Sequence, residues 1–218
     1  MMKQIHTLIS KELLLEWRHK AAFAGILLYL VSSVFVCYLT FDGLIDNKTW
    51  NALFWIILLF ASLNAVLKSF VQETDGRMLY YYIMVSPQTL IISKIIYNGV
   101  FMMVLSLIGL AVYFAFLGNP VQQMSLFVVN MVAGVMGLSA IMSLVSAIVS
   151  KVKNNFTLMG ILSFPLVLPL LLVLIRVSHA SLYAGSMAAH LGDLLVIILL
   201  TCVTFVLSVL LFPFIWKD

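Results

Sequence analysis

The chain has 218 residues, of which 64% are hydrophobic and 9% are charged. A soluble domain carries about a quarter charged residues, so this chain has too little polar surface for a water-soluble fold. The formal net charge of +4 would suggest an anionic partner in a soluble protein. In a membrane protein it is better explained by basic residues gathered on the cytoplasmic side, and no nucleic-acid partner is expected.

The first segment, residues 1–20, mixes charges with apolar residues. Its apolar side chains lie near one helical face: Ile5, Leu8, Ile9, Leu13 and Trp17. Such a pattern is typical of an amphipathic helix that lies in the membrane interface. We therefore predict an N-terminal interfacial helix, the alternative being a solvated leader.

Six stretches poor in charge follow the leader. About 20 mostly apolar residues are needed to cross the hydrocarbon core of a bilayer. The predicted spans are residues 21–40, 50–67, 95–117, 126–149, 156–175 and 194–216. The predicted fold class is therefore all-α, a polytopic membrane protein with six transmembrane helices that form one domain over residues 1–218.

The basic residues predict the orientation of these spans. With six spans both termini lie on the same side of the membrane. If that side is inside, only Lys48 and Arg176 of the 12 Lys and Arg residues fall in outer loops. Because basic residues collect on the cytoplasmic side, we predict that both termini are cytoplasmic.

The longest inner segment, residues 68–94, joins the second and third predicted spans. It contains a polar turn in which Glu73, Asp75 and Arg77 surround Gly76, and an apolar, aromatic stretch follows. This pattern is consistent with a short helix half-submerged at the inner surface, which would present a protruding segment to a cytoplasmic partner. A re-entrant hairpin or a plain connector fits the pattern equally well.

Ser86 and Pro87 break this segment near its end. Ser is favoured as a helix N-cap and Pro at the first helical position. The pair therefore predicts a sharp turn and a new helix that leads into the third span.

Two prolines, Pro165 and Pro169, lie inside the fifth predicted span. Each removes one backbone hydrogen bond and kinks the helix, which leaves the carbonyls of Ile161 and Pro165 in need of other partners. The prolines predict a kink, which is either a hinge, a pathway lining or a static feature of the helix.

Small and polar residues within the spans predict helix packing. The fourth span has small residues at spacings of three or four: Ala133, Gly137, Ala140, Ser143 and Ala147. Such stripes allow helices to approach closely. The amides of Asn64, Asn98 and Asn130 are expected to bond between helices, with a role in a pathway as the alternative.

The chain lacks the residues that several classes of function require. The chain has no P-loop for ATP, no ionisable residue in mid-span for ion coupling, and no catalytic set, so it is not expected to be an enzyme. His179 and His190 of the last outer loop could ligate a metal or haem iron, but we interpret them as solvated. We therefore predict no metal site and no firmly bound cofactor.

Three sets of residues together resemble the CcmB family, the haem exporter B permease of cytochrome c maturation. The inner segment matches through Phe70, Glu73, Asp75, Gly76, Leu79, Ser86, Pro87 and Lys94. The run from Pro165 to Leu171 is similar to the family's double-proline span, and Lys11-Glu12-Leu13 before Arg18 is similar to its start. Departures from the family lie in the run from Glu73 to Tyr80 and at Lys153-Asn154-Asn155, which indicates a divergent branch.

The resemblance implies a permease of the ABC type II exporter kind in a bacterial inner membrane. The inner segment, with Arg77 included, would dock on a separate CcmA-like ATPase, and a CcmC-like haem-handling protein would belong to the complex. ATP hydrolysis would drive haem export or release of the haem-loaded chaperone CcmE, with haem as the handled ligand, and two copies per complex are implied. The alternatives are another type II exporter, for lipid, glycan or drug, and a membrane-embedded enzyme, which would need clustered polar residues.

Overall fold

The computed structural model of the chain describes residues 2–18, 20–42, 45–71, 85–149, 155–183 and 186–217. Its elements are α1 (Met2–Arg18), α2 (Lys20–Phe41), α3 (Asn47–Val71), α5 (Pro87–Leu117), α6 (Met124–Val149), α7 (Asn155–Ser181), the 3-10 helix η1 (Met187–His190) and α8 (Leu191–Lys217). The described residues contain no strand, and six of their helices are long and apolar enough to cross a membrane. The predicted all-α, six-span fold class is confirmed.

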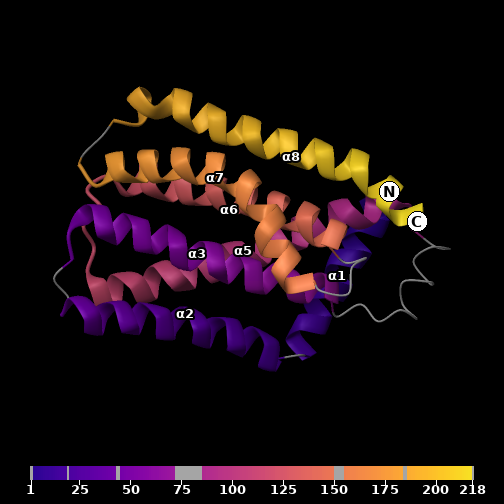
Figure 1. Cartoon of the computed structure of the whole chain (residues 1–218), viewed down its shortest axis with the longest axis horizontal. Coiled ribbons are helices and arrows are strands. Elements are labelled where there is room, and N and C mark those ends of the chain that lie inside the picture. The colour runs from indigo at the N-terminus through magenta and orange to yellow at the C-terminus, as the bar shows by residue number, and fades with distance from the viewer. Residues whose placement is uncertain are drawn as a thin grey trace.

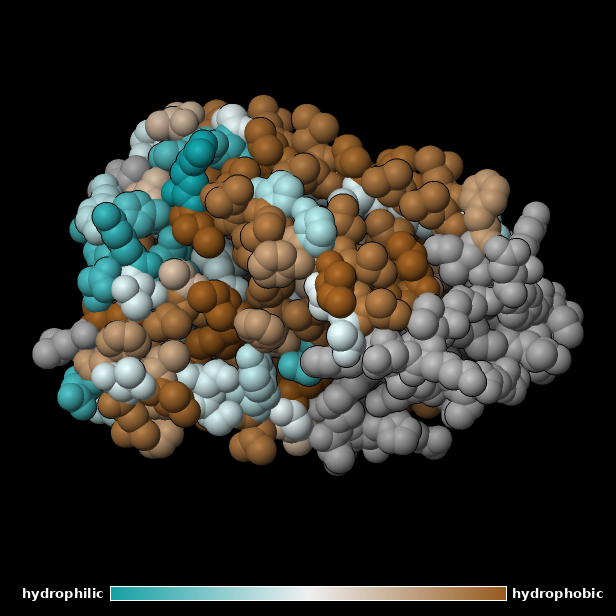
Figure 2. All heavy atoms as spheres, in the orientation of Figure 1, coloured by the Kyte–Doolittle hydropathy of each residue, from teal (hydrophilic) through white to brown (hydrophobic). Residues whose placement is uncertain are grey.

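The long helices lie side by side in one elongated bundle, and both chain ends lie at the same end of it (Figure 1). Figure 2 shows apolar side chains over the middle of the visible face, while hydrophilic residues gather at the end of the bundle opposite the chain ends. This apolar outer surface is what a chain surrounded by lipid requires.

Helix α6 is the centre of the bundle. It packs against α3, α5, α7 and α8. In the most apolar 18-residue stretch of α6, 78% is buried, whereas 22% of the corresponding stretch of α8 is buried. A Cβ added at Gly137 would lie 2.8 Å from Leu170 of α7. One added at Gly134 would lie 2.7 Å from Leu174 of α7 and 2.8 Å from Trp55 of α3. Small residues therefore let α6 approach its neighbours, as the predicted stripe required.

Helix α5 begins eight residues before the predicted third span. It starts at Pro87 and continues through Lys94. The predicted span begins only after Lys94 because spans are predicted as stretches without charged residues. The loop predicted over residues 68–94 is also shorter than expected, because α3 continues to Val71 and residues 87–94 are helical. Lys94 is accordingly a buried residue of a helix, and it does not belong in the count of loop cations.

Helix α7 is longer than the predicted fifth span and ends at Ser181. Arg176 does not end the helix because its side chain, 73% exposed, points away from the bundle. The hydroxyl of Ser178 donates to the carbonyl of Leu174, at 2.7 Å, within the same helix. The residues from Val177 to Ser181 are therefore the last turn of a helix, in which Val177, Ser178 and Ser181 are buried.

Helix α1 confirms the predicted amphipathic leader helix and packs against α5 and α2. Leu8 is buried, Ile5 and Ile9 are half-buried, and Leu13 is 46% exposed. The apolar face therefore covers the base of α5 with one part and leaves another part uncovered.

Candidate functional site

The predicted docking residues divide into two groups. Phe70 lies in the last turn of α3, and Ser86 and Pro87 begin α5. The remaining residues of the predicted docking segment lie outside the described part of the chain: Glu73, Asp75, Gly76, Arg77 and Leu79. Their role stays a prediction.

The start of α5 is fixed by its cap. Ser86 has an extended backbone, and its Oγ accepts from the backbone N–H of Thr89 at 3.4 Å. The two hydroxyls of Ser86 and Thr89 lie 2.7 Å apart, and Pro87 occupies the first turn. The predicted cap is confirmed, so whatever precedes it enters α5 at a defined residue and angle.

Lys94 is the most deeply buried charged residue of the described chain. Its side chain is 1% exposed, and its Nζ lies 3.9 Å from Oε1 of Glu12 in α1, which is 12% exposed. The same Oε1 accepts from Nζ of Lys11 at 2.9 Å. The base of α5 and the leader helix are thus joined by opposite charges.

Just beyond Lys94, polar side chains attach α5 to the central helix α6. The hydroxyl of Ser139 donates to the carbonyl of Ile95 at 3.1 Å. The amide of Asn98 donates to Oγ of Ser143 at 2.9 Å. All four residues are buried, and such bonds hold membrane helices in register where lipid offers no polar partner.

A second polar network binds the C-terminal half of α7 to α3 and α6. The amide of Asn51 donates to the carbonyl of Ile175 at 2.9 Å, and Nε1 of Trp55 donates to Oγ of Ser178 at 2.8 Å. From α6, Asn130 donates to the carbonyl of Leu174 at 3.0 Å. This half of α7 is therefore fixed to two neighbours.

The N-terminal half of α7 is held differently. Part of its surface around the two prolines faces outward, with Phe164 58% exposed and Leu168 42% exposed, whereas Ser163 and Val167 are buried. An apolar pocket of about 110 Å³ separates this half from α3 and is lined by Leu59, Phe60, Leu63, Gly160, Ser163, Phe164, Val167, Leu168 and Leu171. Pro165 and Pro169 lie inside α7, and Figure 1 shows the helix changing direction part-way along its length.

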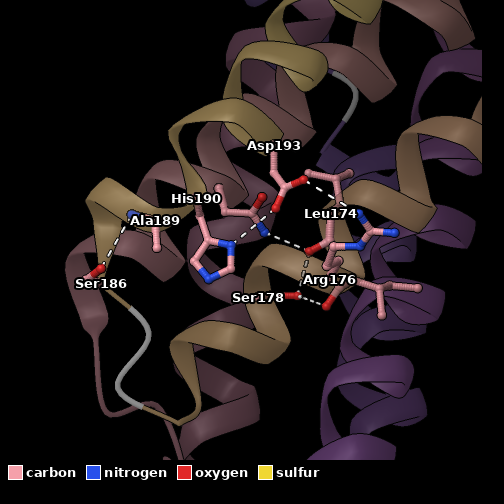
Figure 3. A network of polar contacts seen from close by, with 9 residues as sticks. Leu174, Arg176, Ser178, Ser186, Ala189, His190 and Asp193 are labelled. Atoms are coloured by element: carbon pink, nitrogen blue, oxygen red, sulfur yellow. Dashed lines mark hydrogen bonds and ion pairs between the residues drawn. The ribbon is translucent and has the colours of Figure 1, made fainter.

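The C-terminal end of α7 meets the start of α8 through charges. Figure 3 shows the carboxylate of Asp193 between Arg176 and His190. Its oxygens lie 3.7 Å from Nη1 of Arg176 and 3.2 Å from Nδ1 of His190. His179 packs against Tyr183, with ring centroids 5.0 Å apart. Neither histidine is the freely solvated side chain that we expected, and the described residues contain no group of three metal-ligating side chains.

Two of the three predicted interhelical asparagine bonds are confirmed, at Asn98 and Asn130. Asn64 is the exception, because its amide donates to the carbonyl of Phe60 in its own helix at 2.9 Å. Sequence reasoning missed Asn51 and Ser178, which lie near span ends where polar residues are ordinary. Only the helical spacing from Asn51 to Trp55 could have indicated that both face one neighbour.

A family model described as CcmB protein matches residues 3–216, nearly the whole chain. None of the curated proteins matches the sequence. The match includes both the leader helix that carries Glu12 and the double-proline helix α7. The chain therefore belongs to the CcmB family, and is a multi-pass membrane permease subunit of haem export in cytochrome c maturation.

Proposed function

We propose that this subunit couples ATP hydrolysis by a separate CcmA-like ATPase to haem export or to release of the haem-loaded chaperone CcmE. The whole chain acts as one permease domain, and haem is the handled cargo. A CcmC-like haem-handling protein belongs to the same complex, which holds two copies of this chain. Family membership supports an ABC complex with an ATPase partner and other cytochrome c maturation components.

The ATPase docks on the segment between α3 and α5. The contact residues in this proposal are Phe70, Glu73, Asp75, Gly76, Arg77, Leu79, Ser86 and Pro87. One observation carries it: the segment leads into α5 at a fixed cap, and α5 is bonded to the central helix α6 through Ser139 and Asn98. A displacement of the docked segment would therefore be passed to the centre of the bundle.

The orientation follows from the same proposal. The docking segment and both termini face the cytoplasm, the chain lies in a bacterial inner membrane, and α1 rests at the inner lipid interface. Ten of the 12 Lys and Arg residues were assigned to the inner side, and moving Lys94 from the loop into α5 leaves nine against two. The positive-inside bias that supports this orientation therefore survives the correction.

The two prolines of α7 supply the moving part. Pro165 and Pro169 lie within the stretch of α7 that borders the apolar pocket, residues 160–171. They precede the stretch that is bonded to α3 and α6, residues 174–178. Closing this apolar pocket of about 110 Å³ requires no hydrogen bond to be broken. We propose that the N-terminal half swings at these prolines when ATP is hydrolysed.

The test is co-purification of the permease with the ATPase from detergent. Asp75→Asn and Glu73→Gln should lower ATPase recovery and the yield of c-type cytochromes together. Asp42→Asn, the same chemical change on an exposed residue after α2, is the matched control and should change neither. The proposal fails if the wild-type chain recovers no ATPase, or if a strain that lacks the chain makes normal amounts of c-type cytochromes.

A further inference from the structure

We propose that Lys94 is a positioning residue whose buried ammonium, paired with Glu12, ties the leader helix α1 to the base of α5 so that the two move as one unit. This inference rests on the proposed coupling through α5 and adds α1 to the parts that move. It assigns a role to Lys94, the most deeply buried charged side chain among those that the structure describes.

The burial of Lys94 is the first step. An ammonium that is 1% exposed is costly unless a charge or hydrogen-bond acceptor compensates for it. Glu12 supplies that charge from α1, with 3.9 Å between Nζ and Oε1. At this distance the contact is an ion pair. It constrains how far apart the two helices lie, but it does not impose the direction that a hydrogen bond would.

The position of Lys94 along α5 is the second step. It lies seven residues after Pro87, about 10 Å along the helix axis at 1.5 Å per residue. The next residue, Ile95, accepts the hydroxyl of Ser139 in α6. Lys94 therefore stands between the cap that receives the docking segment and the first bond to the central helix.

The packing of α1 is the third step. Leu8 is buried, but Leu13 and Leu14 are 46% and 65% exposed. Apolar burial alone therefore covers only part of α1, and helices in lipid gain little from apolar contact with one another. The ion pair to Lys94 supplies a specific attachment that apolar packing lacks.

The variant Lys94→Met removes the ammonium and keeps an unbranched apolar chain in the buried position. We expect normal membrane levels and normal ATPase co-purification, with the cytochrome yield per permease lowered about tenfold, within the usual range of coupling between two sites. Exchanging the charges, Glu12→Lys with Lys94→Glu, should restore most of the yield. Lys48→Met, the same change at an exposed residue in the first turn of α3, is the matched control.

A distance measurement separates this role from general destabilisation. Spin labels go on cysteines at Leu14 of α1, 65% exposed, and Ile96 of α5, 36% exposed, after Cys37 and Cys202 are replaced by Ser. The distance distribution should be narrow in the parent and in the charge exchange, and broad in Lys94→Met. Glu12→Gln gives a second broadened variant if Lys94→Met does not accumulate.

The inference is overturned if Lys94→Met and Glu12→Gln both keep a narrow distribution, or if both keep the parent's cytochrome yield. A charge exchange that accumulates normally but restores nothing also overturns the pairing. These outcomes differ from failure of the proposed function, in which the unsubstituted chain itself recovers no ATPase.

Discussion

The two halves of α7 differ in what holds them, although both are apolar and belong to one helix. The C-terminal half receives hydrogen bonds from Asn51, Trp55 and Asn130. The N-terminal half presents Phe164 and other apolar side chains outward and borders an apolar pocket. Hydrogen bonds fix distance and direction, whereas apolar contacts in lipid can be exchanged for lipid at little cost.

This difference indicates which part of α7 is able to move. A proline weakens the backbone ladder of a helix, but movement also requires that one side of the weak point be free. In α7 both prolines lie in the apolar stretch, next to its boundary with the bonded stretch that begins at Leu174. Each prediction below tests one side of that boundary.

The largest effect is expected at the close contact of α6 with the bonded half. Gly134→Leu would place a side chain where a Cβ already meets Leu174 and Trp55 at under 3 Å, so we expect a loss of about 3 kcal/mol in the free energy of unfolding. Gly160→Leu is the matched control, because a Cβ there meets nothing within 4 Å. Unfolding in detergent measures both, and equal losses would contradict the comparison.

The next effect concerns the boundary itself. Replacing Pro165 and Pro169 together by Ala restores two backbone hydrogen bonds, so thermal stability should hold or rise. We expect the cytochrome yield to fall about tenfold, which is about 1.4 kcal/mol of coupling. Replacing Pro213 of α8 by Ala is the control and should leave the yield unchanged. An unchanged yield in the double variant would mean that the kink is static.

A smaller effect is expected from the hydrogen bonds of the bonded half. Ser178→Ala leaves Nε1 of Trp55 without its acceptor, which should cost about 1 kcal/mol, since interhelical bonds in membranes average about 0.6 kcal/mol and reach about 1.7. Ser163→Ala in the other half removes a hydroxyl that donates to the carbonyl of Gly160 in its own helix. Chemical unfolding should show a smaller loss for Ser163→Ala, and the reverse order would sink the distinction.

The smallest effect is expected outside the boundary. Arg176 is 73% exposed and lies 3.7 Å from Asp193, and exposed ion pairs of this kind contribute about 0–1 kcal/mol. Arg176→Gln should therefore change the unfolding midpoint only slightly, and added salt should reduce the difference further. A large loss would show that α8 depends on this contact for its place against α7.

Composition and spacing predicted the number of spans, the amphipathic leader, the Ser86 cap and the small-residue stripe of α6, because each depends on residues close in the chain. They predicted that Asn98 and Asn130 bond between helices, but not their partners and not the other members of the two networks. Asn51 and Ser178 are 127 residues apart, and Lys94 and Glu12 also lie far apart in the chain. The predicted third span also leaves Lys94 out, because spans are predicted as stretches without charged residues. That criterion takes no account of a charge that has a partner inside the protein.

The central place of α6 has a consequence for how the protein is made. Asn130 enters the membrane before its acceptor exists, because the carbonyl of Leu174 comes 44 residues later in the chain. Until α7 arrives, Asn130 lacks the acceptor that it has in the finished bundle. We therefore expect an insertion intermediate of four spans in which this bond has not yet formed, and a chain cut before α7 should be a preferred substrate for membrane quality control.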